Sequence, residues 1–214
     1  PGRIVKDLFS GRSGAIIAAV AVAGWFAAGL YYFGIAPESV QNSQMPVAET
    51  AGTAAIGGPF SLIDQDGKRV TEQDFAGKYL LVYFGYAYCP DICPATLYTM
   101  TEALDQLGDK AKAVQPILIT VDPERDTPEI LKQYVGNFHP DLVGLTGSPA
   151  EVSAAAKAYR VYFAKVVVDD GDPDNYLVDH SAFVFLIAPN GGYITHFSSS
   201  TTPAEMAERL AELL

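Results

Sequence analysis

Residues 78–94, KYLLVYFGYAYCPDICP, hold the features around which the rest of the chain can be arranged. Residues 79–84 are an almost uninterrupted run of Leu, Val, Tyr and Phe, which predicts a strand covered on both faces. From Ala95 onward, apolar residues recur three and four apart, which predicts a helix. The only two cysteines of the chain, Cys89 and Cys93, lie between these elements. Because a helix N-terminus stabilises thiolates, we expect the functional site here.

Composition limits the class of protein. The chain has 214 residues, enough for one domain with appendages, and 49% of them are hydrophobic, which is ample for a core. Its formal net charge of −11 argues against nucleic-acid binding, which requires a basic surface. A disulfide between Cys89 and Cys93 would close a very short loop and stabilise the fold little. The cysteine pair is therefore interpreted as reactive or metal-binding.

The N-terminal third predicts a membrane anchor followed by a linker. Residues 1–13 are short and basic, and residues 14–36 contain no charge. As a helix the uncharged segment would be about 34 Å long, enough to span a bilayer, with the N-terminus in the cytoplasm. The alternative is a cleaved signal peptide, whose apolar region is usually shorter. Residues 37–58 are small and polar and predict a flexible linker, so that the folded domain covers residues 59–214.

Within that domain, strand and helix patterns alternate. Strand patterns occur at residues 59–63, 69–71, 79–84, 115–121, 142–146, 162–168, 181–188 and 193–197. Helix patterns occur at residues 95–108, 127–138, 148–161 and 202–214, the last three with N-cap signals at Thr127, Ser148 and Thr202. An acidic turn is expected at residues 169–175. This order predicts an α/β domain with a central mixed sheet and a ligand site at the carboxyl ends of its strands.

The spacing of the two cysteines allows two kinds of chemistry. Three residues separate Cys89 from Cys93, whereas the disulfide oxidoreductase motif has two. In the first turn of a helix this spacing brings both sulfurs to one face. Two thiolates suit Cu(I), with an imidazole as a third ligand. A redox disulfide without metal fits the same spacing, and the residues alone leave both open.

The three histidines differ in their surroundings. His139 is expected to interact with a helix C-terminus, and His196 is expected on the surface of a late hairpin. His180 ends the acidic turn and begins the buried strand 181–188, a place where a lone histidine is more often structural than a ligand.

A charged cluster, Asp122 to Asp126, follows the strand 115–121 at the edge where the cysteines are expected. The interpretation that the residues favour is a loop with an Arg125–carboxylate pair and helix caps. The alternative is a group that supports or docks onto the site.

Three sequence blocks carry a resemblance to a known family. They are YFGYAYCPDICPATL at 83–97, ITVDPERDTPEILKQYV at 119–135 and YLVDHSAFVFLIAPNGGY at 176–193. Together, and in this order, they resemble the Sco/SenC family of copper chaperones, and the similarity covers residues 59–214. The resemblance implies a thioredoxin-like fold with an extra β-hairpin, preceded by a single transmembrane helix. It also implies a copper ion held by Cys89, Cys93 and His180.

The function implied by the resemblance is that of a membrane-anchored copper chaperone. We expect copper handling rather than catalytic turnover, and the resemblance also permits a thiol–disulfide oxidoreductase activity. Such a chaperone delivers one copper to a copper centre of cytochrome c oxidase during assembly, with the copper-bearing oxidase subunit and other periplasmic copper chaperones as partners. The topology predicts a bacterial inner-membrane protein with a periplasmic domain. The alternative is the mitochondrial inner membrane, with the domain facing the intermembrane space.

Two further functions remain open. A thiol–disulfide reductase would use Cys89 and Cys93 as a redox pair to keep oxidase cysteines reduced, but would not explain His180. An accessory subunit would stay bound to a respiratory oxidase.

Overall fold

The computed structural model describes residues 56–168, 172 and 175–214. The predicted anchor at 14–36 and most of the predicted linker at 37–58 lie outside this part of the chain. Among the described residues, no helix combines the length and the apolar character needed to cross a membrane.

Strands and helices alternate as the sequence predicts. The strands are β1 (Ser61–Asp64), β2 (Arg69–Thr71), β3 (Tyr79–Gly85), β4 (Val114–Thr120), β5 (Val143–Thr146), β6 (Phe163–Val167), β7 (Tyr176–His180), β8 (Val184–Ile187) and β9 (Tyr193–Phe197). The α-helices are α3 (Ile92–Leu107), α4 (Pro128–Val135), α5 (Pro149–Ala158) and α6 (Pro203–Leu213). Short 3₁₀ helices cover Glu72–Phe75 and Gly108–Ala113.

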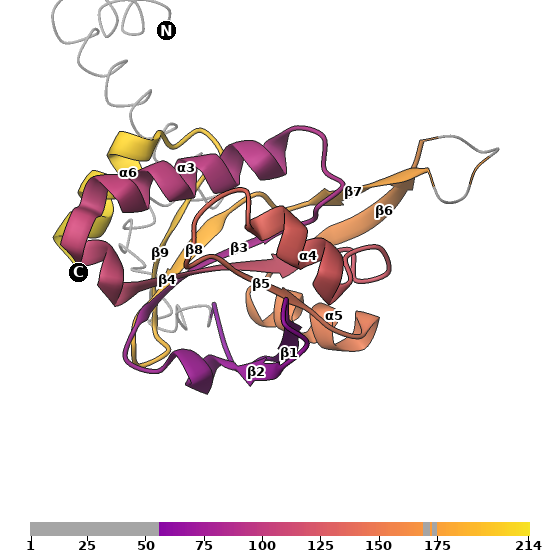
Figure 1. The fold of residues 1–214 in the computed structure, drawn as a ribbon, viewed down its shortest axis with the longest axis horizontal. Coiled ribbons are helices and arrows are strands. Elements are labelled where there is room, and N and C mark those ends of the chain that lie inside the picture. The colour runs from indigo at the N-terminus through magenta and orange to yellow at the C-terminus, as the bar shows by residue number, and fades with distance from the viewer. Residues whose placement is uncertain (1–55, 169–171, 173–174) are drawn as a thin grey trace, which may run out of the picture. The chain divides into compact units, whose positions relative to one another are not determined.

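The centre of the domain is a seven-stranded mixed sheet with the order β2-β1-β5-β4-β3-β8-β9. Strands β3, β4 and β5 are parallel neighbours, whereas β8 runs antiparallel to β3. Figure 1 shows α3, α4 and α6 on one side of this sheet and α5 on the other. The predicted α/β domain with a mixed sheet is therefore confirmed.

Strand β3 is the core of the sheet because helices cover both of its faces. All of its residues after Tyr79 are buried. On the α5 side, the rings of Phe84 and Tyr159 lie with their centroids 5.2 Å apart, and Phe185 completes the cluster. Because each fully buried large apolar side chain contributes roughly 1.5–3 kcal/mol, this strand is a rigid support for whatever follows it.

The three predicted N-caps are confirmed. The side chains of Thr127, Ser148 and Thr202 each accept a hydrogen bond from the backbone N–H three residues later, and a proline follows each of them. A cap of this kind satisfies an N–H group that has no partner within the helix.

The end of α4 differs from the prediction. The helix stops at Val135, with Gly136 as its C-cap, rather than at residue 138. His139 therefore lies beyond the helix, where its Nδ1 accepts a hydrogen bond from the backbone N–H of Asp141 at 3.1 Å. The expected interaction of His139 with helix carbonyls is wrong, because the helix ends before reaching it.

The segment before β8 also differs. The sequence predicts one strand over residues 181–188, with His180 directly at its start, but β8 covers only Val184–Ile187. His180 is instead the last residue of a separate strand, β7, which pairs with β6 in a two-stranded sheet. Tyr176 and Val178 are buried and Leu177 between them is exposed, which is the alternation typical of a strand. The pattern is short and directly follows the acidic segment 169–175, so the sequence analysis did not assign it to a strand. Figure 1 shows the β6–β7 arm extending away from the main sheet.

Candidate metal centre

Segments distant in sequence meet at one edge of the main sheet. The cysteine loop follows the carboxyl end of β3, and Asp122 follows the end of the parallel strand β4. Because β8 is antiparallel to β3, with Tyr83 opposite Val184, the start of β8 lies at this same edge. His180, four residues before Val184, is thereby brought to the cysteine loop. The site lies where the strand order predicts a ligand.

The structure brings together the three residues that the family resemblance implies as ligands. One ligand atom from each of Cys89, Cys93 and His180 lies within 4.8 Å of the other two. His180 Nε2 is 3.4 Å from Cys93 Sγ. The Cys93 backbone N–H points to Cys89 Sγ at 3.4 Å, as the start of α3 at Ile92 allows. Cys93 is fully buried and Cys89 is 9% exposed, so the group lies just beneath the surface.

The imidazole of His180 is oriented by its surroundings. Its Nδ1 lies 3.3 Å from the carbonyl oxygen of Ser181, which accepts a hydrogen bond when Nδ1 carries the proton. In that tautomer Nε2 has a free lone pair directed toward Cys93. The rings of Tyr83 and Tyr86 flank the imidazole, with centroids 6.1 and 5.9 Å away. Such contacts to the other ring nitrogen orient histidine ligands in metal sites.

The two thiols have different proton affinities. The pKa of Cys89 lies well below its ordinary value, because the Cys93 thiol and backbone N–H groups donate to its thiolate. The pKa of Cys93 is raised, because the Cys89 sulfur and burial both oppose a second negative charge. These opposite shifts favour one thiolate and one thiol in the metal-free pair. A bound cation would remove the repulsion that keeps Cys93 protonated.

Gly85, the last residue of β3, leaves room for this pair. A Cβ placed on it would lie 2.7 Å from the Tyr83 ring and 3.1 Å from Cys93 Sγ. Both distances are shorter than ordinary contact, so only glycine allows the buried sulfur to approach the strand this closely.

The Asp122–Asp126 loop packs beside the cysteine loop. Arg125 Nε donates to the buried Asp122 carboxylate at 2.5 Å, so the expected Arg125–carboxylate pair is confirmed. Asp126 accepts hydrogen bonds from the Ala87 N–H at 3.0 Å and the Thr120 hydroxyl at 2.6 Å. Its other carboxylate oxygen is buried and has no hydrogen-bond partner among the residues that the structure describes. Burial raises the pKa of Asp126 to about 6.

The raised pKa of Asp126 predicts a pH dependence of stability. Because its folded-state pKa is above the unfolded value of 3.8, its stabilising contribution is complete below about pH 4 and is lost as pH rises through about 6. Asp126→Asn should therefore gain stability relative to the parent over this range, by up to about 3 kcal/mol at about 1.4 kcal/mol per pKa unit. Urea unfolding of the reduced, metal-free chain at pH 4 and pH 7 measures this. An unchanged difference between the two proteins would contradict it.

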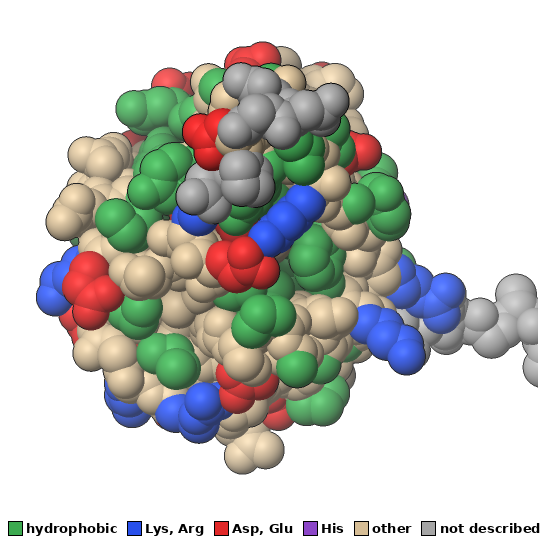
Figure 2. Space-filling view, turned by 90° about the vertical axis from the view of Figure 1, so that its right-hand side faces the viewer, with side chains coloured by type: hydrophobic (Ala, Val, Ile, Leu, Met, Phe, Trp, Pro, Cys, Tyr) green, Lys and Arg blue, Asp and Glu red, His purple; other side chains and the backbone are tan. Residues whose placement is uncertain are grey.

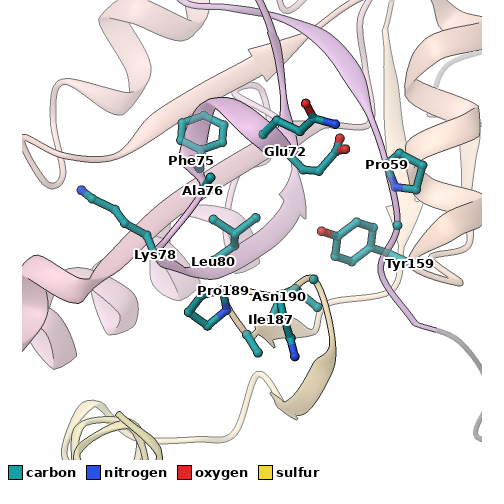
Figure 3. Close-up of a pocket in the computed structure, with 14 residues that line it drawn as sticks. Pro59, Glu72, Phe75, Ala76, Lys78, Leu80, Tyr159, Ile187, Pro189 and Asn190 are labelled. Atoms are coloured by element: carbon teal, nitrogen blue, oxygen red, sulfur yellow. The ribbon is translucent and has the colours of Figure 1, made fainter.

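The other histidines and a pocket beside Leu80 lie apart from this group. His196 is exposed on β9, as predicted, with Nδ1 2.6 Å from the Tyr193 hydroxyl. A pocket of about 400 Å³ opens near the amino end of β3, beside Leu80, and none of the three candidate ligands lines it. Figure 3 shows the Tyr159 hydroxyl directed into this pocket.

The sequence reasoning did not anticipate several contacts of the site. It did not assign Tyr83 and Tyr86 to the surroundings of His180, or Gly85 to the approach of Cys93. The signal for the glycine was available, because a glycine that ends an otherwise bulky buried strand often marks a close approach.

Comparison with known proteins agrees with this geometry. The sequence profile of the SCO1/SenC family matches residues 48–214, most of the chain. The chain belongs to the SCO1/SenC family. A SCO2-like protein of Rickettsia felis is 41% identical over 81% of this chain and 83% of its own length. The mitochondrial SCO1 homolog 1 of Arabidopsis thaliana is 45% identical over 76% of this chain, which spans only 49% of that protein.

Solved structures of the SCO1/SenC family share the fold. Bradyrhizobium japonicum ScoI with copper bound has a TM-score of 0.68 and 46% identity, covering 75% of this chain and 100% of that chain. Arabidopsis thaliana ScoI with copper bound has a TM-score of 0.69 and 43% identity, covering 74% and 98%. A third structure is that of BsSco. BsSco is described as a member of the Sco family of cytochrome c oxidase assembly proteins, in which a disulfide switch was identified. It has a TM-score of 0.57 and 27% identity, covering 74% and 91%. The thioredoxin-like Sco fold is thus confirmed for the described residues.

Proposed function

We propose that this SCO1/SenC family member binds one Cu(I) ion through Cys89 Sγ, Cys93 Sγ and His180 Nε2. The observation that carries the proposal is the meeting of these three atoms within 4.8 Å, although 87 residues separate Cys93 from His180. Two thiolates and one imidazole are soft and borderline donors that suit Cu(I). Solved structures of two relatives are described as having copper bound, which supports copper as the ion.

The arrangement suits transfer of copper as cargo. Three protein ligands leave a coordination position for an incoming thiolate, and Cys89 and His180 lie near the surface. Ligand exchange can then pass the ion to a partner without releasing it to water. We infer that the acceptor is a copper-bearing subunit of cytochrome c oxidase, since BsSco is described as belonging to a family of assembly proteins for that enzyme.

The partner surface we propose is mixed rather than uniformly acidic. Figure 2 shows the face toward which the β6–β7 arm points, and its visible part intersperses acidic, basic and apolar side chains. The net charge of −11 still favours a basic partner at long range.

We further propose that residues 14–36 anchor the chain, that residues 37–58 tether it, and that residues 59–214 form a domain in the bacterial periplasm. The basic residues before the apolar segment support this orientation. Rickettsial and mitochondrial relatives accord with a membrane that carries a respiratory chain.

Removing the imidazole tests the three-ligand site. His180→Ala should weaken Cu(I) binding by at least about 10-fold, because changes merely in the surroundings of a metal ligand already cost about 10- to 100-fold. Competition titration of the reduced full chain against a Cu(I) chelator measures the affinity. His196→Ala, on the exposed face of β9, is the matched control and should bind as the parent does. Equal affinities in parent and His180→Ala would exclude His180 as a ligand.

A thiol–disulfide reductase is the second candidate, and the lowered pKa of Cys89 favours it. A thiolate at a helix N-terminus beside a second thiol is the arrangement that disulfide exchange requires. This activity would not need an imidazole ligand. Reduction of a partner disulfide at the same rate in the parent and in His180→Ala would support the reductase, whereas loss of copper binding alone supports the chaperone.

A further inference from the structure

The position of His180 depends on side-chain contacts, because β7 has no hydrogen-bonded neighbour in the main sheet. Among the described residues, β7 pairs only with β6, while the cysteine loop follows β3 in the seven-stranded sheet. The pairing of β8 with β3 brings the chain after His180 to the edge where the cysteine loop lies, but no strand pairing in the described residues joins β7 itself to the main sheet. Side chains of the loop after β4 contact β7 directly.

Arg125 and Asp122 both hydrogen-bond to Tyr176, the first residue of β7. Arg125 Nη1 donates to the carbonyl oxygen of Tyr176 at 3.1 Å, and its guanidinium carbon lies 3.7 Å from the centre of the Tyr176 ring. The Tyr176 hydroxyl in turn donates to Asp122 Oδ1 at 2.8 Å. The other oxygen of Asp122 accepts from Arg125 Nε, so the three side chains form a closed ring of contacts.

Arg125 also contacts Tyr86 and Tyr88, in the segment that directly precedes Cys89. The Arg125 guanidinium carbon lies 5.0 Å from the Tyr88 ring centre and 6.0 Å from that of Tyr86. The Tyr86 hydroxyl accepts a hydrogen bond from the backbone N–H of Val178, in the middle of β7, at 3.2 Å. Arg125 thus contacts both segments that carry the candidate copper ligands.

We propose that Arg125 is a positioning residue that holds His180 within reach of the cysteine sulfurs and thereby sets the affinity for Cu(I). The inference rests on the proposed function, because it concerns the same site. Arginine suits the role, since one planar guanidinium can bond a carboxylate and a carbonyl while it stacks on aromatic rings. Its charge is also needed by Asp122, which is fully buried.

A double-mutant cycle separates positioning from a general effect on the fold. Arg125→Met should weaken Cu(I) binding by about 10- to 100-fold, the range typical of residues that orient a metal ligand. In the His180→Ala background the same change should have little effect, because no imidazole is left to position. Arg209→Met, which removes an exposed pair with Glu212 on α6, is the matched control and should bind as the parent does.

If Arg125→Met does not fold, a milder variant tests the same proposal. Tyr176→Phe removes one hydroxyl from the ring of contacts but keeps the aromatic ring under the guanidinium. It should weaken binding in the same direction by a smaller factor, again only while His180 is present.

A metal-free readout accompanies the titrations. In the parent, the His180 ring lies beside Tyr83 and Tyr86, so its proton signals should carry ring-current shifts in NMR spectra. Arg125→Met should move these signals toward those of a free histidine, while signals from β3 stay in place.

The outcomes distinguish the two proposals. Weakening by Arg125→Met that disappears without His180 supports the positioning role. If Arg125→Met weakens Cu(I) binding equally in the parent and in His180→Ala, or in neither, the positioning role is overturned. The proposed copper site still stands in that case, provided that His180→Ala by itself weakens binding. A parent chain that binds no Cu(I) would overturn both.

Discussion

Cys93→Ser should abolish tight binding of Cu(I), the largest effect expected from a single substitution. Cys93 is fully buried, its sulfur lies 3.4 Å from His180 Nε2, and a hydroxyl is a poor ligand for Cu(I). The affinity should fall by more than the roughly 100-fold upper range for residues that merely orient ligands. Competition titration of the reduced chain measures this, and far-UV circular dichroism checks that the fold persists.

Ser153→Ala, on the exposed side of α5, serves as a control in which one side-chain atom is changed outside the site. It should bind Cu(I) as the parent does. If Cys93→Ser retained the parental affinity, the ion would have to be bound elsewhere, and the assignment of Cys93 would be wrong.

Gly85→Ala should affect both stability and copper binding. The added methyl would lie 2.7 Å from the Tyr83 ring and 3.1 Å from Cys93 Sγ, in a strand buried on both faces. Overpacking of this kind costs roughly 1–3 kcal/mol, because neighbours must leave their preferred positions. Since Cys93 is one of those neighbours, the affinity for Cu(I) should fall together with the free energy of unfolding.

Gly192→Ala provides the comparison for this change. There a Cβ would meet only the side chain of the exposed residue Asn190, at 3.1 Å, and that side chain can move. Urea unfolding and Cu(I) titration of both variants test the prediction. A Gly85→Ala chain as stable as the parent would mean that the strand end adapts more easily than its packing indicates.

Local patterns predicted the strands and helices that support the site. The apolar run of β3 and the three-and-four spacing of α3 need only neighbouring residues to be recognised. For the same reason Thr127 and Ser148 were recognised as caps. Strand β7 was missed because its alternation, Tyr176 and Val178 against exposed Leu177, is short and follows an acidic turn.

Contacts between distant segments were beyond the residue pattern. Nothing local to His180 indicates that Cys93 lies beside it, and only the family resemblance implied that they act together. The contact between Arg125 and Tyr176 spans 51 residues and depends on how the β6–β7 arm meets the loop after β4. Such packing follows from the whole fold rather than from any one segment.

The most direct test of the copper site compares Cu(I) binding by the reduced and oxidised forms of the full chain. A competition titration should find one tightly bound ion per chain when both thiols are reduced. It should find binding weakened beyond the effect of His180→Ala when Cys89 and Cys93 form a disulfide, since oxidation removes two of three ligands. Equal binding by the two forms, or no tight binding by the reduced chain, would contradict a copper site built on these cysteines.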